Sequence, residues 1–127
     1  MSLTTNPPAS SKVIEAFLSR VGFALPAGYE KFIRRSNGAE GFLQESYLIL
    51  WPVEDLFTHN EAYRVKEYAP EFFIVGSDGG DISYAADKQT GALYAMPFIG
   101  MSPEQATWLA KDFDDFLNMN LTTFRAS

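Results

Sequence analysis

The sequence of 127 residues contains no cysteine. This absence excludes disulfides, thiolate metal sites and a cysteine nucleophile, and it suits a reducing compartment. Basic residues are also few, because 10 Lys and Arg stand against 16 Asp and Glu, for a formal net charge of -6. Nucleic-acid backbones are bound by clustered Lys and Arg, so direct nucleic-acid binding is not expected. The acidic balance is compatible with a basic protein partner.

The sequence also lacks long apolar runs, internal repeats and low-complexity segments. No stretch is apolar for long enough to span a bilayer, which excludes a helical membrane anchor within it. Residues 1–12 do not have the basic start and apolar run of a secretion signal. We therefore expect a cytoplasmic protein with no membrane partner, and the pattern leaves its oligomeric state open.

Apolar and aromatic residues are abundant. Hydrophobic residues make up 46% of the chain, including 11 Phe, 6 Tyr and 2 Trp. A chain of this length and composition buries about two-thirds of its unfolded surface in one core. We expect a flexible arm over residues 1–11, a single domain over residues 12–121 and a tail over residues 122–127, with Leu121 and Phe124 packing back.

The pattern of apolar and turn-forming residues predicts an α+β fold, with a mostly antiparallel sheet of five to six strands flanked by N-terminal, middle and C-terminal helices. The expected strands are 41–43, 47–51, 72–75, 82–86 and 92–96. The expected helices are 12–21 capped by Ser10 or Ser11, 26–36 ended by Asn37-Gly38, 53–67, a capping-box turn over 102–110, and a last helix capped by Asp112.

The stretch from 71 to 95 is the centre of this arrangement, with three strands and an acidic turn between the first two. Asp78-Gly79 is a strong hairpin signal, and the two glycines of the turn supply positive φ angles. The strand over 82–86 alternates, so we expect it to be half buried. Asp78 and Asp81 project from the turn without the ligand series of a calcium loop. We interpret the segment as a hairpin turn and leave a recognition role open.

An enzymatic hypothesis requires Glu40, Asp78, Asp81 and His59 to converge as acid, base or metal ligands. His59 is the only histidine, and position 63, one helical turn later, is Tyr rather than a ligand. Because no spacing favours a site of this kind, we expect no catalytic residue, no metal ligand and no cofactor.

Six short motifs, taken together, resemble those of the SUKH superfamily. They are Leu25-Pro26-x-x-Tyr29-x-x-Phe32, Asn37-Gly38-x-Glu40-Gly41, a strand ending in Trp51, Ile74-x-Gly76-Ser77-Asp78-Gly79-Gly80-Asp81, Asp87-x-x-x-Gly91-x-Leu93-Tyr94 and Ala110-x-Asp112-Phe113-x-x-Phe116-Leu117. The resemblance covers residues 14–117, with Asp112 at a position where the family often has Ser. It implies an α+β fold without enzymatic activity, found in fungal cell-wall-synthesis regulators and in bacterial immunity proteins that bind and block a toxin domain, often a nuclease.

On this basis the sequence predicts a non-enzymatic protein-binding module, an immunity protein whose partner is a basic toxin. The alternatives are an intracellular regulatory or scaffold protein of the same superfamily and, less favoured, a carboxylate- or metal-dependent hydrolase. The candidate contact residues are acids near turns, namely Glu40, Glu45, Glu54, Asp55, Asp78 and Asp81.

Overall fold

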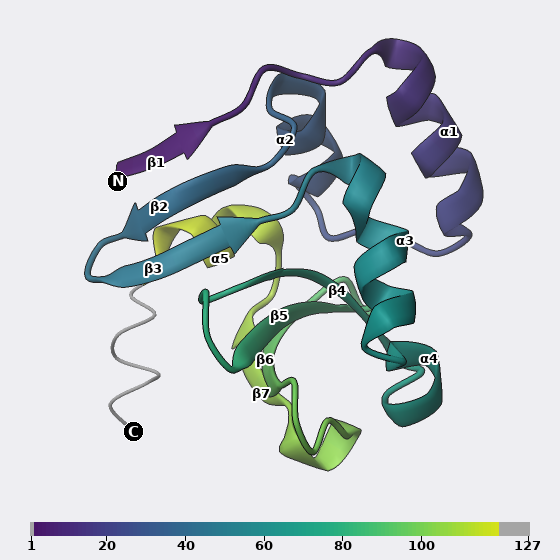
Figure 1. Cartoon of the computed structure of the whole chain (residues 1–127), viewed down its shortest axis with the longest axis vertical. Coiled ribbons are helices and arrows are strands. Elements are labelled where there is room, and N and C mark those ends of the chain that lie inside the picture. Colours follow the sequence, from purple (N-terminus) through teal and green to yellow (C-terminus); the bar gives the residue numbers. More distant parts are fainter. Residues whose placement is uncertain (1, 120–127) are drawn as a thin grey trace.

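One antiparallel sheet runs through the whole fold as a meander of seven strands, in the order of the chain (Figure 1). The structure, a computed structural model, describes residues 2–119. The strands are β1 (Ser2–Thr5), β2 (Ala39–Leu43), β3 (Ser46–Leu50), β4 (Phe72–Ser77), β5 (Ile82–Asp87), β6 (Leu93–Pro97) and β7 (Thr107–Ala110). Each strand is antiparallel to the next. The predicted α+β class with a mostly antiparallel sheet is therefore confirmed.

The helices occupy the segments between these strands and after the last one. They are α1 (Ser11–Val21), α2 (Tyr29–Arg35), α3 (Val53–Ala62), α4 (Val65–Tyr68) and α5 (Phe113–Asn118), with a 3-10 turn at Pro103–Gln105. In Figure 1, α1, α3 and α4 lie together on the right-hand side of the view. Within residues 2–119 none of the helices has the length and apolar character needed to cross a membrane.

Two of the predicted helix caps are confirmed. Ser10 Oγ accepts a hydrogen bond of 3.2 Å from the backbone N–H of Val13, which starts α1. Asp112 Oδ1 accepts one of 2.8 Å from the N–H of Asp115, which starts α5. Each side chain satisfies one of the backbone donors that a helix start leaves unpaired. These local signals therefore fixed the starts of the first and last helices.

The predicted capping box at residue 102 is wrong. The Ser102 side chain caps nothing, and the turn after it is a 3-10 helix of 3 residues. The next residues form β7, in which Trp108 pairs with Tyr94 and Ala110 with Leu93. Pairing with a strand already held in the sheet outweighed the local helical signal, as tertiary context commonly does.

Two further boundaries differ from the prediction. The helix expected over 53–67 is divided, because Arg64 adopts a left-handed conformation with φ 56° between α3 and α4. At the N-terminus, Ser2–Thr5 pairs with β2, in a stretch where no strand was expected. The predicted tail at 122–127, and the packing of Leu121 and Phe124, lie outside the described residues.

Strand β5 is buried on both faces, so the predicted half-buried strand is wrong. Tyr84 belongs to the larger apolar cluster, which packs under α1, α2 and α5. Ala85 points to the opposite face, into a smaller cluster that includes Val65 of α4 and Met101. Both Tyr84 and Ala85 are 0% exposed. The alternation was correct, but α4 and the segment after β6 cover the face expected to meet water.

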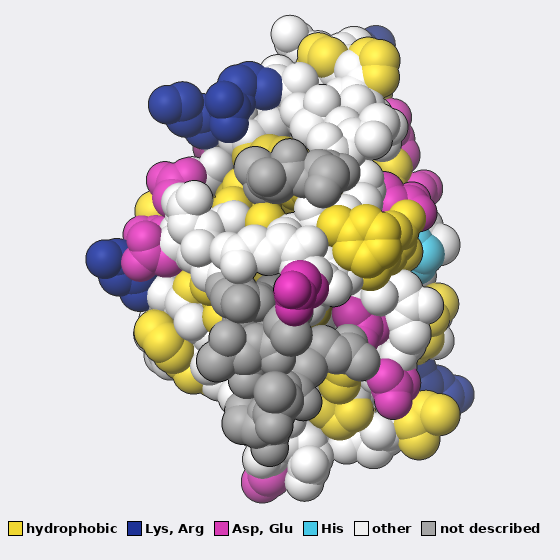
Figure 2. Space-filling model, turned by 90° about the vertical axis from the view of Figure 1, so that its left-hand side faces the viewer, with side chains coloured by type: hydrophobic (Ala, Val, Ile, Leu, Met, Phe, Trp, Pro, Cys, Tyr) yellow, Lys and Arg dark blue, Asp and Glu magenta, His cyan; other side chains and the backbone are white. Residues whose placement is uncertain are grey.

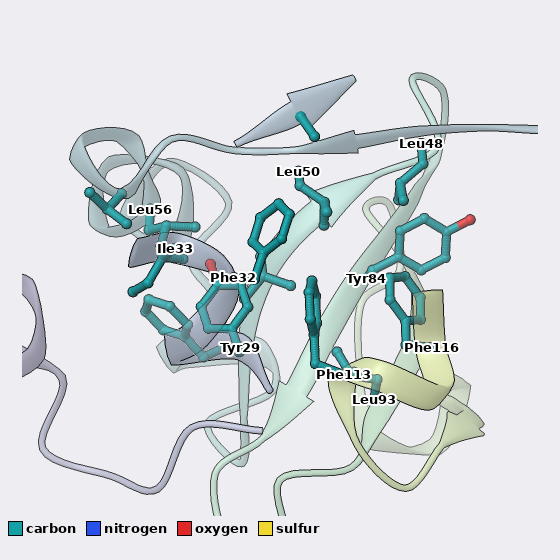
Figure 3. Close-up of a cluster of buried hydrophobic side chains, with 14 of the residues drawn as sticks. Tyr29, Phe32, Ile33, Leu48, Leu50, Leu56, Tyr84, Leu93, Phe113 and Phe116 are labelled. Atoms are coloured by element: carbon teal, nitrogen blue, oxygen red, sulfur yellow. The ribbon is translucent and has the colours of Figure 1, made fainter. Parts of the chain in front are cut away.

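Aromatic rings from α2, β5 and α5 form the centre of the larger cluster (Figure 3). Tyr29 meets Phe113 edge to face with ring centroids 5.0 Å apart. Tyr84 meets Phe116 in the same manner at 5.3 Å. Edge-to-face pairs of buried rings add about 0.5–1.5 kcal/mol each beyond their apolar burial. These contacts hold α2 and α5 on the same face of the sheet.

The hydroxyl of Tyr84 is buried and has no hydrogen-bond partner among residues 2–119. An unpaired buried hydroxyl costs about 1–3 kcal/mol of desolvation. We expect Tyr84→Phe to leave the free energy of unfolding unchanged or to raise it by about 1 kcal/mol, measured by urea denaturation. The matched control is Ser83→Ala, because Ser83 Oγ donates to the Met96 carbonyl at 2.8 Å and its loss should destabilise the fold. Equal destabilisation by both changes would contradict this reading of Tyr84.

The same hydroxyl predicts a pH dependence. Burial raises the pKa of Tyr84 to about 12 from the ordinary value of 10.0. The unfolded chain releases this proton near pH 10, whereas the folded chain keeps it until about pH 12. The free energy of unfolding is therefore unaffected by Tyr84 titration below pH 10 and falls as the pH rises from 10 through about 12. As the pH rises between these two values, the free energy of unfolding should fall less in Tyr84→Phe than in the unmodified protein. The same urea experiment measures this difference.

Candidate functional site

The acidic turn between β4 and β5 is a hairpin turn, as predicted. Asp78 Oδ1 accepts hydrogen bonds from the backbone N–H groups of Gly80 at 2.8 Å and Ile82 at 3.2 Å. Of the two glycines only Gly79 has a positive φ, at 85°, which corrects the expectation that both would. One carboxylate oxygen of Asp78 therefore closes the turn, while Asp81 is exposed.

An acidic and aromatic surface lies on the side of β2 and β3 that faces away from the larger core cluster. Phe42 pairs with Tyr47 across the two strands and Glu40 with Ile49, and these four side chains are here called the outer face. The Phe42 and Tyr47 rings meet edge to face at 5.2 Å, and Phe42 is 50% exposed. Tyr47 Oη donates to the Glu40 carboxylate, and this bond raises the pKa of Tyr47. The bond holds a carboxylate beside a pair of rings of which Phe42 is exposed.

The acidic turn lies against this outer face. A Cβ at Gly79 would sit 3.3 Å from Tyr47 Cδ2 and 3.7 Å from Ile49 Cδ1, which is the spacing of packed atoms. The turn that carries Asp78 and the β2 residue Glu40 therefore meet the same aromatic side chain, Tyr47, from two different elements. Figure 2 views the molecule from the left of Figure 1, and it shows hydrophobic side chains on its right with acidic side chains above and below them.

A groove of about 530 Å³ continues the outer face toward β1 and the start of α3. Its lining includes Thr4, Asn6, Glu40, Tyr47, Ile49 and Trp51. The Trp51 ring stacks on His59 of α3, with centroids 4.2 Å apart and planes at 29°. His59 thus supports an aromatic side chain. Among residues 2–119 no three His, Cys, Asp or Glu side chains are grouped so as to hold a metal ion.

Glu54 is held near the groove by Asn37. Asn37 Oδ1 accepts a hydrogen bond of 2.9 Å from the N–H of Val53, the first residue of α3. Its Nδ2 donates to Glu54 at 2.7 Å. Asn37 was expected to end α2, but Ser36 is the C-terminal cap and Asn37 caps α3 from a distance. Pro52, which directly precedes α3, lines the groove, so the bonds from Asn37 fix the first turn of α3 next to the groove.

The structure therefore brings together part of the predicted acidic set. Glu40 belongs to the outer face, the turn of Asp78 packs against Tyr47 at Gly79, and Glu54, two residues after Pro52 of the groove, bonds to Asn37. Glu45 is exposed in the β2–β3 turn, and Asp55 is exposed on α3. Glu40 and the turn of Asp78 and Asp81 are here called the rim of the outer face, while Glu45, Glu54 and Asp55 lie on other segments.

The sequence reasoning missed that apolar surface. The run 47–51 was predicted as a strand with no exposed face assigned to it, and in the structure only its alternate members Leu48 and Leu50 are buried. Tyr47 and Ile49 are half-buried on the outer face. Alternation was the available signal, but it carries no information on burial when every residue of a strand is apolar.

This fold and this surface define a class: a small α+β domain, with a meandering antiparallel sheet that presents an acidic and aromatic face. The sequence model of the SMI1 / KNR4 family (SUKH-1) matches residues 8–119, and the protein belongs to that family. The match confirms the resemblance that the turn and core motifs carried. No curated protein sequence is significantly similar to the chain.

Proposed function

We propose that this protein is a non-enzymatic immunity protein that neutralises a basic toxin, such as a nuclease domain, by binding it through the outer face. Family membership supports a role in protein binding. The observation that carries the choice of surface is the exposed Phe42 ring, which packs against a half-buried Tyr47 whose hydroxyl is bonded to the Glu40 carboxylate. Proteins that bind by their surfaces concentrate binding energy in aromatic residues of this kind.

The charge of the rim suits the proposed partner. A nuclease holds the phosphate backbone of its substrate with clustered Lys and Arg. Carboxylates placed around aromatic rings are complementary to such a cluster, and they also accelerate and orient the encounter. Bound there, the protein occupies the face that the nucleic acid needs. No reaction at the outer face is required for this mode of inhibition.

Truncation of the exposed ring is the sharpest test. We expect Phe42→Ala to weaken binding to the cognate toxin, for which the product of the adjacent gene is the first candidate to test, by about thirtyfold, the loss typical of an aromatic hot spot. Affinity is measured by calorimetry, and function by rescue of growth when both proteins are expressed. Asp81→Lys is the charge variant of choice, because Asp78 closes its own turn and its replacement would disturb the fold.

Matched controls are available outside the outer face. Ile99 is 89% exposed and Glu104 is exposed, both in the segment between β6 and β7. Ile99→Ala and Glu104→Lys should leave affinity unchanged. If they weaken binding while Phe42→Ala does not, the partner binds elsewhere. A stable complex that gives no rescue of growth favours the regulatory or scaffold role over immunity.

A further inference from the structure

A second surface has the opposite charge. A cleft of about 450 Å³ opens between α1, the α3–α4 junction and the start of β4, and we call it the α1–α3 cleft. Its charged lining consists of Arg20, Arg64, Lys66 and Lys88, with Glu61 and Glu67. Four cations and two carboxylates give the lining a net charge of +2, in a protein whose net charge is -6. The cleft thus concentrates cationic side chains, which are few in the chain as a whole.

The two carboxylates neutralise this lining weakly. Arg20 and Glu61 are 3.4 Å apart, and their side chains are 61% and 74% exposed. Arg64 and Glu67 are 3.7 Å apart and similarly exposed. Exposed pairs of this length contribute about 0–1 kcal/mol and exchange readily with other partners. Arg64 also has the Tyr68 side chain as a neighbour. Because both guanidinium groups are largely exposed, they are accessible to an anion.

The two lysines of the cleft have no acidic partner at all within residues 2–119. Burial, together with the neighbouring charge of Lys66, lowers the pKa of Lys88. Like charges held close to each other are stabilised by a bound anion. The cleft thus contains an uncompensated pair of cations.

The wall of the cleft is apolar and aromatic. The Arg20 guanidinium lies 3.9 Å from the centroid of the Phe57 ring, and Lys88 Nζ lies 5.4 Å from that of Phe23. Phe72 and Phe73 close the base and are 5% and 4% exposed. A guanidinium already stacked on one ring presents its other side to a planar group. The volume lies within the range of about 300–1,000 Å³ found for small-molecule sites.

The cleft is separate from the outer face. Successive residues of a helix are about 100° apart, so residues two positions apart point to nearly opposite sides. Phe57 and Glu61 line the cleft, whereas His59 between them stacks on Trp51 beside the outer face. Helix α3 therefore stands between the two surfaces, and each can be changed without the other.

We propose that the α1–α3 cleft binds a small phosphorylated compound with a planar apolar group, of the nucleotide class. A diphosphate carries the two or more negative charges that a lining of +2 balances, which a single carboxylate does not. The planar group lies against the Phe23 and Phe57 wall and the Arg20 guanidinium. A site of this size encloses a small ligand rather than an extended acidic segment of another protein.

The test uses the whole protein and three probes: ADP, adenosine and inorganic pyrophosphate. Calorimetry should show that ADP binds. Adenosine and pyrophosphate should each bind at least about tenfold more weakly than ADP, because each lacks one half of the contacts. No binding of ADP at millimolar concentration overturns the proposal. Pyrophosphate as tight as ADP overturns the planar part of it, and a poly-glutamate peptide tighter than ADP replaces it by a protein-binding site.

Two variants locate the site without loss of the fold. Lys66→Gln with Lys88→Gln removes a repulsive pair, and it should weaken ADP by about tenfold or more because charge-assisted hydrogen bonds are lost. Arg64→Gly removes a guanidinium from a residue with φ 56°, a conformation that glycine adopts freely, so thermal stability should be retained while ADP binding falls. Unchanged ADP affinity in both variants would overturn the assignment.

The matched control changes the same number of charges elsewhere. Lys12 and Lys31 are exposed on α1 and α2 and do not line the cleft. Lys12→Gln with Lys31→Gln should leave ADP affinity unchanged, and an equal loss would mean that only the overall charge matters. Because Phe42→Ala should not affect ADP binding, failure of this proposal and failure of the immunity role are distinguishable.

Discussion

Gly76→Ala should lower the free energy of unfolding by about 3 kcal/mol or more, the upper end of the range for overpacked sites. A Cβ at Gly76 would lie 2.2 Å from the carbonyl oxygen of Ile49 and 3.2 Å from Leu50 Cδ2. The obstacle at Ile49 is backbone, so no change of rotamer relieves it. Gly76 pairs with Leu50 on one side and Tyr84 on the other, next to an irregularity in the β4–β5 register. The neighbouring strands therefore prevent it from moving away.

Gly80→Ala is the control within the same hairpin. A Cβ there meets only Asp78 Oδ1, at an ordinary contact distance of 3.5 Å. Its effect on the free energy of unfolding, measured by urea denaturation, should be within about 0.5 kcal/mol, as for most surface substitutions. If both variants lose the same stability, the close approach of β3 and β4 at Gly76 is not the cause.

Local signals in the sequence accounted for much of the fold. Caps, turn glycines and short apolar runs act within a few residues, so α1, α5 and the β4–β5 hairpin follow from Ser10, Asp112 and Asp78 directly. The strands that were missed, β1 and β7, lie at the two edges of the sheet. Their formation depends on partners β2 and β6, and a four-residue strand with mixed polarity has no distinctive pattern of its own.

The candidate sites followed the same division. Acids near turns could be named because turns are recognisable from Gly and Asp. Of these acids, Glu40 bonds to Tyr47, and the turn that carries Asp78 packs against the same ring at Gly79. The α1–α3 cleft could not be found in this way. Its cations come from Arg20, Arg64, Lys66 and Lys88, on separate elements that only the folded chain brings together. In the sequence these are isolated charges of a solvated surface.

The two surfaces have complementary roles in the proposed activity. Most acidic side chains lie outside the cleft, so the proposed basic partner would be attracted to the acidic outer face rather than to the +2 lining. Conversely, a phosphorylated small molecule is repelled by the rim of Glu40 and Asp78 and is attracted to the cleft. Opposite charge on the two sides of α3 thus separates the two classes of ligand.

Asn60 determines how α3, the helix between these surfaces, is joined to the sheet. Strand β3 pairs with β4 only at Ser77 and Gly76, which leaves the edge of β4 at Ile74 without a strand partner. The Asn60 side chain takes that place, because its Oδ1 accepts from Ile74 N–H at 2.9 Å and its Nδ2 donates to the Ile74 carbonyl at 2.9 Å. Ile74 is 0% exposed, so no water replaces these bonds readily. One side chain therefore reproduces a pair of ladder hydrogen bonds.

Asn60→Leu should destabilise the fold by about 3 kcal/mol, since it leaves a buried donor and a buried acceptor without partners at about 1–3 kcal/mol each. Asn118→Leu is the matched control, because Asn118 makes a single exposed bond to the Asp114 carbonyl, and it should change stability by less than about 1 kcal/mol.

Asn60→Asp separates the two bonds to Ile74, because an ionised carboxylate accepts from the Ile74 N–H but cannot donate to the Ile74 carbonyl. Burial should raise the pKa of the introduced carboxyl group, so this variant should regain stability as the pH falls and the group becomes protonated, and lose it as the pH rises. Urea denaturation at acidic and at alkaline pH measures the difference. A loss of stability in Asn60→Leu no larger than in Asn118→Leu would show that Ile74 finds other partners.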